Sequence, residues 1–262
     1  MNTNVDFYEV FASSYEAFYA DVDAPEAVRQ WLMFLEDKGF VPPRAKRLSR
    51  PLTLLDIGCG PGCHLRPWQQ AGFHLSGLDA SPSMLRLAAH NAAAGVGTDV
   101  PLYCADLRDT TSVAPLAERF DVAVSHFNFL NLIAPADLEA VFRTVASVLG
   151  VNGFWATDLS VAVPEQLARE MDPVGTSIEI RLLGQEPAEI PNCVRVRWEI
   201  HGQFFYELYW MHPLDTLRAA AGIAQLDGMR VAGWTPEDRR TPWHPTLSDP
   251  RLLLVFSRSA EL

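Results

Sequence analysis

From residue 51 onward, short apolar runs alternate with segments whose apolar residues recur at a helical spacing. The apolar runs are bounded by turn residues, and their length is typical of strands buried inside a parallel sheet. They lie at residues 52–57, 73–79, 100–104, 120–125 and 153–159, and the helical segments lie at 63–71, 82–93 and 135–149. Strands that alternate with helices at this interval indicate βαβ units. The pattern therefore predicts an α/β fold with a doubly wound, mostly parallel sheet.

The pattern changes after residue 160, where runs of β type follow one another without helices between them. These runs lie at 176–184, 193–201 and 203–211. Short connections such as His201-Gly202 are typical of antiparallel strands. The alternation then resumes with a helix at 213–221 and apolar strands near 228–234 and 251–258. We therefore predict a main sheet of seven strands and an antiparallel insertion before the last helix.

Two helices are predicted near the N-terminus, at residues 6–20 and 25–38, and the first of them is rich in aromatic residues. The basic stretch PPRAKRLSR (42–50) follows, and we interpret it as a solvated linker. This organisation predicts three parts. They are an N-terminal helical lid with its linker at 1–50, a core at 51–160 and 212–262, and an antiparallel insertion at 161–211 that acts as a substrate cap or an oligomer edge.

The amino-acid composition restricts the kinds of partner that we expect the protein to bind. The 262 residues carry a formal net charge of −11, and 48% of them are hydrophobic. A nucleic acid would be repelled by most of such a surface, because its sequence-independent binding depends on Lys and Arg. The four cysteines show neither a CxxC pair nor zinc-ligand spacing, so we expect no metal. Without a long apolar run or a leader-like N-terminus, we expect a cytoplasmic protein with no membrane partner.

The stretch LLDIGCGPGCHL places Gly58, Gly60 and Gly62 between the first predicted strand and a helix. Such a turn lets the backbone approach a ligand and directs free N–H groups toward it. A nucleoside triphosphate site would need Lys and Ser or Thr after the last glycine, and these are absent. A dinucleotide site would have its third glycine one position later. Asp79 suits the ribose of a dinucleotide or of a sulfonium nucleoside, and Asp56 is an acid that the dinucleotide pattern lacks.

Four motifs together carry a family resemblance. They are DIGCGPG (56–62), GLDASPSML (77–85), CADLRD (104–109) and FDVAVSHFNFLNLI (120–133). With them, the chain resembles the class I S-adenosylmethionine-dependent methyltransferases over essentially its whole length. Tyr8, Phe11, Ala12 and Tyr15 and the insertion are similar to the bacterial small-molecule members, including those acting on amino sugars and natural products. The resemblance implies a Rossmann-like sheet, S-adenosyl-L-methionine as cofactor and S-adenosyl-L-homocysteine as product.

The resemblance also implies which residues bind the cofactor. Asp56 would orient the glycine turn, and Asp79 would accept hydrogen bonds from both ribose hydroxyls. Asp106 would accept one from the adenine amino group, and Leu107 would offer its backbone N–H to the ring. The other cofactor residues implied are Tyr15, Gly58, Cys59, Gly60, Gly62, Ala80, Met84 and Ser125.

Each of these acids has an alternative role as a helix cap. Asp79 with Ser81, for example, stands directly before the helix predicted at 82–93, where a cap would stand. Acids at the ends of three successive strands are better explained by one ligand in the crevice at the carboxyl edge of the sheet.

Polar residues beyond the fourth strand are candidates for the acceptor site. His126 is the first candidate for a base or an orienting group, and simple packing is its alternative. The related enzymes often carry a polar ring where this chain has Leu132, which weakens the transfer of a catalytic base. The other substrate candidates are Tyr8, Asn128, Asn131, Asp158, Glu207 and Tyr209.

These candidates have competing interpretations. Tyr8 and Tyr15 would form a lid that excludes water, or would only pack the first helix on the core. Asp158 would hold a cationic amine or cap the segment after it. Glu207 and Tyr209 share one face of a strand, which would roof the pocket or form a half-exposed dimer edge.

The sequence thus predicts an enzyme that methylates N or O of a small metabolite. Two alternatives remain: a cofactor-binding protein of the same fold that is non-methylating or regulatory, and a methyltransferase of a peptide substrate. A homodimer is a further expectation.

Overall fold

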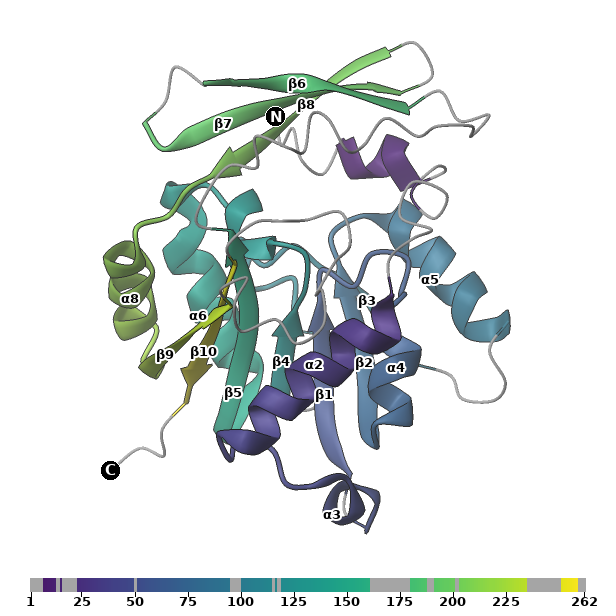
Figure 1. Cartoon of the computed structure of the whole chain (residues 1–262), viewed down its shortest axis with the longest axis vertical. Coiled ribbons are helices and arrows are strands. Elements are labelled where there is room, and N and C mark those ends of the chain that lie inside the picture. The colour runs from purple at the N-terminus through teal and green to yellow at the C-terminus, as the bar shows by residue number, and fades with distance from the viewer. Residues whose placement is uncertain are drawn as a thin grey trace.

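Seven strands form the central sheet of the structure, a computed structural model (Figure 1), in the order β3-β2-β1-β4-β5-β10-β9. The strands are β1 Leu52–Ile57, β2 Phe73–Asp79, β3 Leu102–Cys104, β4 Phe120–Ser125, β5 Leu149–Ser160, β9 Asp227–Trp234 and β10 Arg251–Ser257. Neighbouring strands from β3 to β5 pair in parallel, whereas β10 pairs antiparallel with both β5 and β9. The fold class predicted from the sequence is confirmed.

The structure describes residues 7–12, 15, 23–49, 51–94, 100–114, 116, 119–160, 180–187, 191–200, 203–234 and 251–258. The helices of the described residues include α2 Ala24–Asp37, α3 Arg44–Ser49, α4 Leu65–Gln70, α5 Pro82–Ala94, α6 Leu138–Val148 and α8 Leu214–Ile223, with 3₁₀ turns η1 Phe129–Leu132 and η2 Pro135–Asp137. Residues 7–12 are also helical. The rest of the helix predicted at 6–20, apart from residue 15, lies outside the described residues.

Successive residues of the central strands point to opposite faces of the sheet, and each face has its own core. Leu54 of β1 packs with residues of α2 and α4, whereas Leu55 packs with residues of α6 and α8. The large side chains at the centre of these clusters, such as Trp31 and Trp155, are fully buried. The alternation read from the sequence is therefore that of a sheet covered by helices on both faces.

The strand order reverses at β1, because β2 and β3 extend the sheet on one side and β4 and β5 on the other. At such a switch point the connections leave in opposite directions and open a crevice outside the carboxyl ends of the strands. The glycine turn and the segment after β4 both begin at this crevice.

A second sheet, of β6 Ile180–Pro187, β7 Cys193–Ile200 and β8 Gln203–Trp210, is antiparallel. In Figure 1 it lies across the end of the molecule where the crevice opens, with the short N-terminal helix beneath it. Phe7 and Phe11 of that helix pack against Val196 and Trp198 of β7. The antiparallel insertion before the last helix is thus confirmed, and it contacts the N-terminal helix through aromatic side chains.

The basic stretch at 42–50 was predicted to be a solvated linker. Its described side chains are mostly exposed, but it is not irregular throughout, because Arg44–Ser49 forms helix α3. Pro43 directly precedes this helix, and its carbonyl accepts a hydrogen bond from the Lys46 N–H at 2.9 Å. Arg44 also donates to the Gln70 carbonyl at 3.1 Å, which joins α3 to the end of α4.

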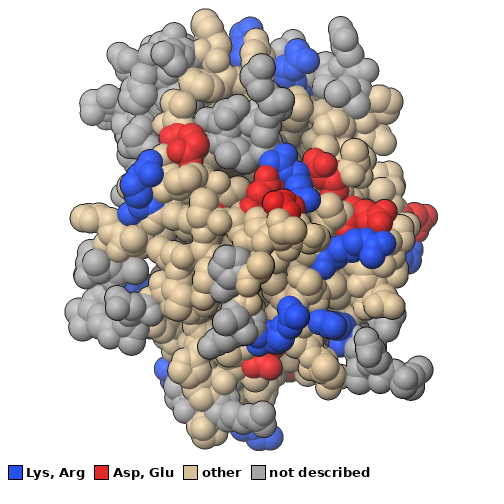
Figure 2. Space-filling model, turned by 180° about the vertical axis from the view of Figure 1, so that it is seen from behind, with Lys and Arg blue, Asp and Glu red and all other residues tan. Residues whose placement is uncertain are grey.

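The described surface carries charges of both signs. On the face drawn in Figure 2, Lys and Arg side chains lie next to Asp and Glu side chains in small groups. The described residues also form ion pairs, among them Arg29–Glu26 on α2 and Arg143–Glu139 on α6. Among the described residues, no helix combines the length and apolar composition needed to cross a bilayer. The absence of a nucleic-acid partner and the homodimer both stay predictions.

Candidate functional site

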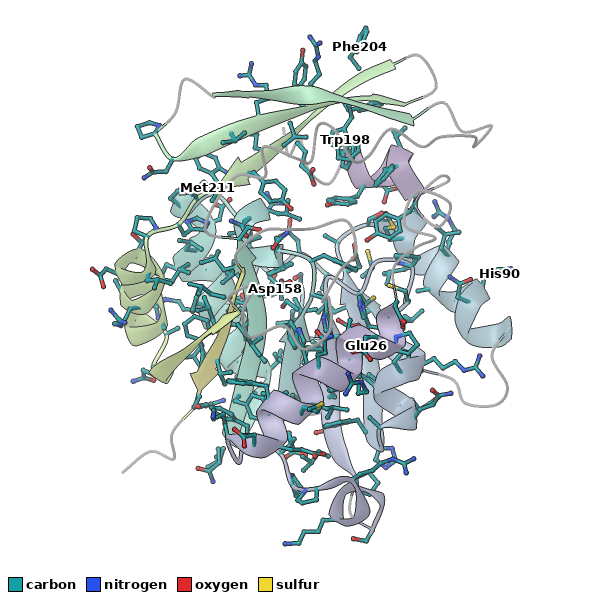
Figure 3. All side chains as sticks on the ribbon, viewed as in Figure 1. Glu26, His90, Asp158, Trp198, Phe204 and Met211 are labelled. Atoms are coloured by element: carbon teal, nitrogen blue, oxygen red, sulfur yellow. The ribbon has the colours of Figure 1, made fainter. Side chains whose placement is uncertain are left out.

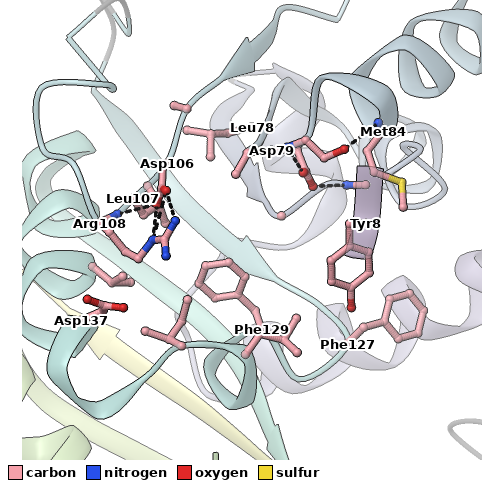
Figure 4. A pocket seen from close by; sticks show the side chains of 18 of the residues that line it. Tyr8, Leu78, Asp79, Met84, Asp106, Leu107, Arg108, Phe127, Phe129 and Asp137 are labelled. Carbon is pink, nitrogen blue, oxygen red and sulfur yellow. Dashed lines mark hydrogen bonds and ion pairs between the residues drawn. The ribbon is translucent and has the colours of Figure 1, made fainter. Parts of the chain in front are cut away.

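A cavity of about 310 Å³ opens at the switch point of the sheet (Figure 4). Its walls come from the turns after β1, β2, β3 and β4, from the N-terminal helix and from β8. The predicted site residues that line it are Tyr8, Tyr15, Gly58, Gly60, Asp79, Ala80, Met84, Asp106, Leu107 and His126. The predicted site residues that do not line it are Asp56, Cys59, Gly62, Ser125, Asn128, Asn131, Asp158, Glu207 and Tyr209. The structure therefore brings together most of the predicted cofactor residues and few of the predicted acceptor residues.

The glycine turn follows β1 and adopts a backbone that L-residues rarely take. Gly58, Gly60 and Gly62 have φ angles of 69°, 53° and 82°. The N–H groups of Gly58 and Cys59 donate to the Leu78 carbonyl at 2.7 and 3.0 Å, which ties the turn to the end of β2. A Cβ at Gly58 would lie 3.0 Å from the Phe129 ring. The turn thus exposes backbone to the cavity at Gly58 and Gly60 while being held from behind.

Asp79 joins the two turns that border the cofactor side of the cavity. One carboxylate oxygen accepts from the Gly60 N–H and the other from the Ser81 N–H, each at 2.8 Å. The cap of α5 is provided separately, because the Ser81 hydroxyl accepts from the Met84 N–H at 3.1 Å. Asp79 is therefore not merely a helix cap. A carboxylate has about four acceptor positions, so capacity remains on the cavity side for a hydroxyl donor.

Asp56 is buried directly beneath the glycine turn. Burial and the nearby Asp79 carboxylate raise its pKa to about 8. Its Oδ2 atom has no hydrogen-bond partner among the described residues. A buried polar oxygen without a partner costs free energy whether or not it carries the proton. The turn therefore suits a ligand that brings donors or positive charge close to Asp56.

We expect the substitution Asp56→Asn to flatten the pH dependence of stability in the unliganded protein. The folded state keeps a proton on Asp56 that the unfolded chain has lost above a pKa of 3.8. The free energy of unfolding therefore falls as the pH rises from there to about 8, by up to about 1.4 kcal/mol per pH unit. Urea unfolding at several pH values measures this slope, with the exposed Asp215→Asn as control. Parallel curves for Asp56→Asn and the unaltered protein would contradict the assignment.

Asp106 lines the cavity but is already ion-paired. Arg108 donates through Nε to both carboxylate oxygens at 2.9 and 3.1 Å, and through Nη2 to Oδ2. The Arg108 side chain thereby lowers the pKa of Asp106. Arg108 also lines the cavity, on the same side as Asp137, as Figure 4 shows. The sequence analysis missed Arg108, although its place two residues after Asp106 in CADLRD was the available signal.

His126 borders the cavity but lies mainly in a buried aromatic cluster. Its Nε2 accepts from the Trp68 indole N–H at 3.1 Å, and its ring stacks on His64 with centroids 4.1 Å apart. Trp31 packs against it at the same centroid distance. Burial and the neighbouring His64 hold the pKa of His126 well below 6.5. Because the accepting nitrogen is occupied by Trp68, these contacts favour the packing role over that of a general base.

Asn128, Asn131 and Asp158 form a buried network beside the cavity. The Asp158 carboxylate accepts from the Asn128 N–H at 2.7 Å, and the Asn128 amide donates to the Tyr209 hydroxyl at 3.3 Å. Asn131 donates to the Ser160 carbonyl at 3.1 Å and to the Trp210 carbonyl at 2.9 Å, and accepts from the Ser160 N–H at 3.0 Å. These hydrogen bonds join η1, β5 and β8, so they indicate that Asn131 has a structural role.

Glu207 is buried and hydrogen-bonded to the N-terminal helix. Tyr8 Oη donates to Glu207 Oε1 at 2.7 Å, and the Glu207 side chain is only 5% exposed. Phe204 and Tyr206 of the same strand are 62% and 40% exposed. Figure 3 shows Phe204 on the outer side of the small sheet and Trp198 on the side of the core. These exposures agree with the interpretation of β8 as a half-exposed strand, and Glu207 belongs to its buried face.

Glu9 fastens the N-terminal helix to the start of α5. Its carboxylate accepts from the hydroxyls of Ser81 and Ser83 at 2.5 and 2.6 Å and from the Ser83 N–H at 3.1 Å. Ser81 is the residue whose N–H Asp79 also binds. The helix that carries Tyr8 is therefore held across the edge of the cavity from two sides, by Glu9 and by Tyr8. The sequence analysis missed Glu9, whose partner lies far away along the chain.

Comparisons with known proteins agree with this arrangement. Residues 54–153 match the family described as "Methyltransferase domain". A ubiquinone biosynthesis O-methyltransferase of Methylobacterium nodulans is 32% identical over 120 residues, which are 45% of each chain. A malonyl-[acyl-carrier protein] O-methyltransferase of Pseudescherichia vulneris is 40% identical over 180 residues, 66% of this chain and 65% of that one. The chain thus spans from about half to about two thirds of the length of these curated relatives.

Solved structures share the fold over more of the chain. The amino pentose methyltransferase CalS10 of Micromonospora echinaspora, solved with S-adenosylmethionine bound, superposes with a TM-score of 0.59 at 20% identity. The superposition covers 94% of this chain and 96% of CalS10. The chain therefore contains a methyltransferase domain at residues 54–153 and has the fold of an S-adenosylmethionine-dependent methyltransferase.

Proposed function

We propose that the protein transfers a methyl group from S-adenosyl-L-methionine to N or O of a small metabolite. The observation that carries the proposal is the cavity at the switch point. One side of it is a polar turn with Gly58, Gly60 and Asp79, and the other side is largely apolar. The polar side fits the nucleoside of the cofactor, and the apolar side fits an acceptor held away from water.

Different residues of the cofactor side bind different parts of S-adenosylmethionine. Asp79 binds the ribose hydroxyls with the acceptor capacity that its backbone bonds leave. Asp56 supplies a negative centre behind the turn once a positively charged ligand lowers its pKa. Leu107, Ala80 and Met84 form the apolar surface for the adenine ring. The Arg108–Asp106 pair lies where the adenine amino group was predicted to bind, so we assign the pair, rather than Asp106 alone, to that end of the site.

Bound S-adenosylmethionine supplies an electrophilic methyl group on a positively charged sulfur. The chain contributes alignment, since an acceptor fixed in line can gain about 7–11 kcal/mol over reaction in free solution. Phe127, Phe129 and Ile133 shape the apolar wall, and Tyr8 and Tyr15 close it from the side of the N-terminal helix. We propose on this basis that residues 1–50 act as a lid and residues 161–211 as a substrate cap on the core of 51–160 and 212–262.

Incubation of the purified chain with S-adenosylmethionine and a panel of amines, alcohols and short peptides tests the proposal. We expect S-adenosylhomocysteine to form by mass spectrometry with at least one small acceptor, and not with Asp79→Ala at the same cofactor concentration. Product formation with peptides alone would favour the peptide-methylating alternative. Cofactor binding without product across the panel would favour the non-methylating alternative.

A further inference from the structure

The carboxylate of Asp106 has little capacity left to accept a hydrogen bond from a ligand. A carboxylate offers about four acceptor positions. Arg108 donates to them through its backbone N–H at 3.0 Å, through Nε to both oxygens at 2.9 and 3.1 Å, and through Nη2. Hydrogen bonds between two charged groups of this kind are among the strongest in proteins. An adenine amino group could therefore bind to Asp106 only by breaking part of this ion pair.

Asp137 brings a second carboxylate to the same part of the cavity. It lines the cavity together with Arg108, and Figure 4 shows the two side chains near each other with no bond between them. Asp137 stands at the N-cap of α6, yet its side chain accepts no hydrogen bond from the helix. Within the described part of the chain its carboxylate forms neither a hydrogen bond nor an ion pair. Its acceptor positions are therefore available to a ligand.

Arg108 adds a hydrogen-bond donor beside this acceptor. Its Nε and Nη2 atoms are held by Asp106, whereas Nη1 forms no hydrogen bond with any described residue. The hydrogen bond to Asp106 raises the pKa of Arg108 most, and the negative charge of Asp137 adds to this rise. The guanidinium group is thus fixed on one side by Asp106 and has Asp137 within electrostatic reach.

The position of the two groups along the cavity agrees with that of the adenine ring. Asp79 marks the ribose end, and the apolar surface assigned to the ring follows from Ala80, Met84 and Leu107. Arg108 comes directly after Leu107 in the chain. In adenosine the amino group lies on the side of the ring system that points away from the ribose. A ring packed on this apolar surface therefore directs its amino edge toward Arg108.

The chemistry of the two groups also fits this edge. Adenine presents an amino donor next to a ring nitrogen that accepts, whereas a 6-oxopurine presents only acceptors there. The carboxylate of Asp137 can accept from the amino group, and Nη1 of Arg108 can donate to the ring nitrogen. A carbonyl oxygen in place of the amino group would meet the Asp137 carboxylate without a proton between them, which is repulsive.

We propose that Asp137 accepts the hydrogen bond from the adenine amino group of the cofactor, that Nη1 of Arg108 donates to the neighbouring ring nitrogen, and that Asp106 stays bound to Arg108. The inference rests on the proposed function and deepens it. Asp137 becomes the residue that selects adenine, in place of the Asp106 contact expected from the sequence.

A matched pair of nucleosides tests the proposal on the full chain. S-adenosylhomocysteine and S-inosylhomocysteine, in which a carbonyl replaces the amino group, are titrated calorimetrically. We expect S-adenosylhomocysteine to bind roughly ten- to hundredfold more tightly, because the amino group donates to a charged acceptor. Asp137→Asn should reduce this preference to about threefold or less, since an amide both donates and accepts. The exposed Glu139→Gln removes a negative charge from the same turn of α6 and should keep the preference.

The outcomes separate this inference from the proposed function. If S-adenosylhomocysteine does not bind, both are contradicted. If it binds but is not preferred over S-inosylhomocysteine, or if the preference persists in Asp137→Asn, only the role of Asp137 is contradicted. A preference that is lost in Asp106→Asn and kept in Asp137→Asn would show that Arg108 gives way to adenine, which also overturns the proposal. Asn and Ser are both favoured at an N-cap, so Asp137→Ser replaces Asp137→Asn should that variant fail to fold, and the same loss of preference is expected.

Discussion

Asp79→Ala is expected to weaken the binding of S-adenosylhomocysteine by roughly ten- to several-hundredfold, because hydrogen bonds to a charged group contribute about 1.5–3 kcal/mol each. The structure adds a second reason. Asp79 also holds the N–H groups of Gly60 and Ser81 in place, so its removal loosens the turns on both sides of the ribose site.

Isothermal titration calorimetry measures this loss directly. Asp215→Ala, at an exposed position on α8 far from the cavity, is the matched control and should bind like the unaltered protein. Asp79→Asn removes the charge but keeps one of the two oxygens that accept a backbone N–H, so it should lose less affinity than Asp79→Ala. Unchanged affinity in Asp79→Ala would remove Asp79 from the cofactor site.

Asn131→Ala is expected to destabilise the protein by roughly 3–5 kcal/mol, because each buried polar group left without a partner costs about 1–3 kcal/mol. The substitution orphans the N–H and carbonyl of Ser160 and the carbonyl of Trp210, all of which bond to a fully buried amide. For a domain of this size such a loss lowers the Tm by about 10 °C.

Urea and thermal unfolding measure the effect. Asn91→Ala is the graded control, because Asn91 is only partly buried and donates to the Pro61 carbonyl at 3.0 Å, and its replacement should cost about 1 kcal/mol. Were Asn131 a substrate residue instead, Asn131→Ala would keep its stability and lose affinity for the acceptor. That result would contradict the structural role assigned here.

The fold and the cofactor side of the site could be read from the sequence because both follow from local patterns. Buried parallel strands have continuous apolar runs, and the carboxyl ends of such strands necessarily meet at one edge of a sheet. Gly58, Gly60 and Asp79 stand at those ends, so their neighbourhood follows from topology alone. The glycines of this turn have positive φ angles, a conformation that glycine adopts readily in the tight turn expected there.

The acceptor side could not be read in the same way, because it depends on contacts between distant segments. Glu207 meets Tyr8 across 199 positions of the chain, and Glu9 meets Ser83 across 74. Sequence reasoning ranked His126 first by its place after β4, but a His in that position can pack as well as react. Its hydrogen-bond partner Trp68 belongs to α4, and the spacing of the two residues in the sequence gives no sign of this bond.

Several of the hydrogen bonds that attach the small sheet to the core are accepted by main-chain carbonyls. Asn131 bonds to the carbonyl of Trp210, and the His212 ring bonds to the carbonyls of Leu130 and Ile133. A carbonyl is present whatever side chain its residue carries, so Trp210 can be replaced without losing its anchorage to Asn131. Side chains of β8 that line the cavity can therefore change during evolution while the small sheet keeps its attachment to the core. The same core could then serve enzymes with different substrates.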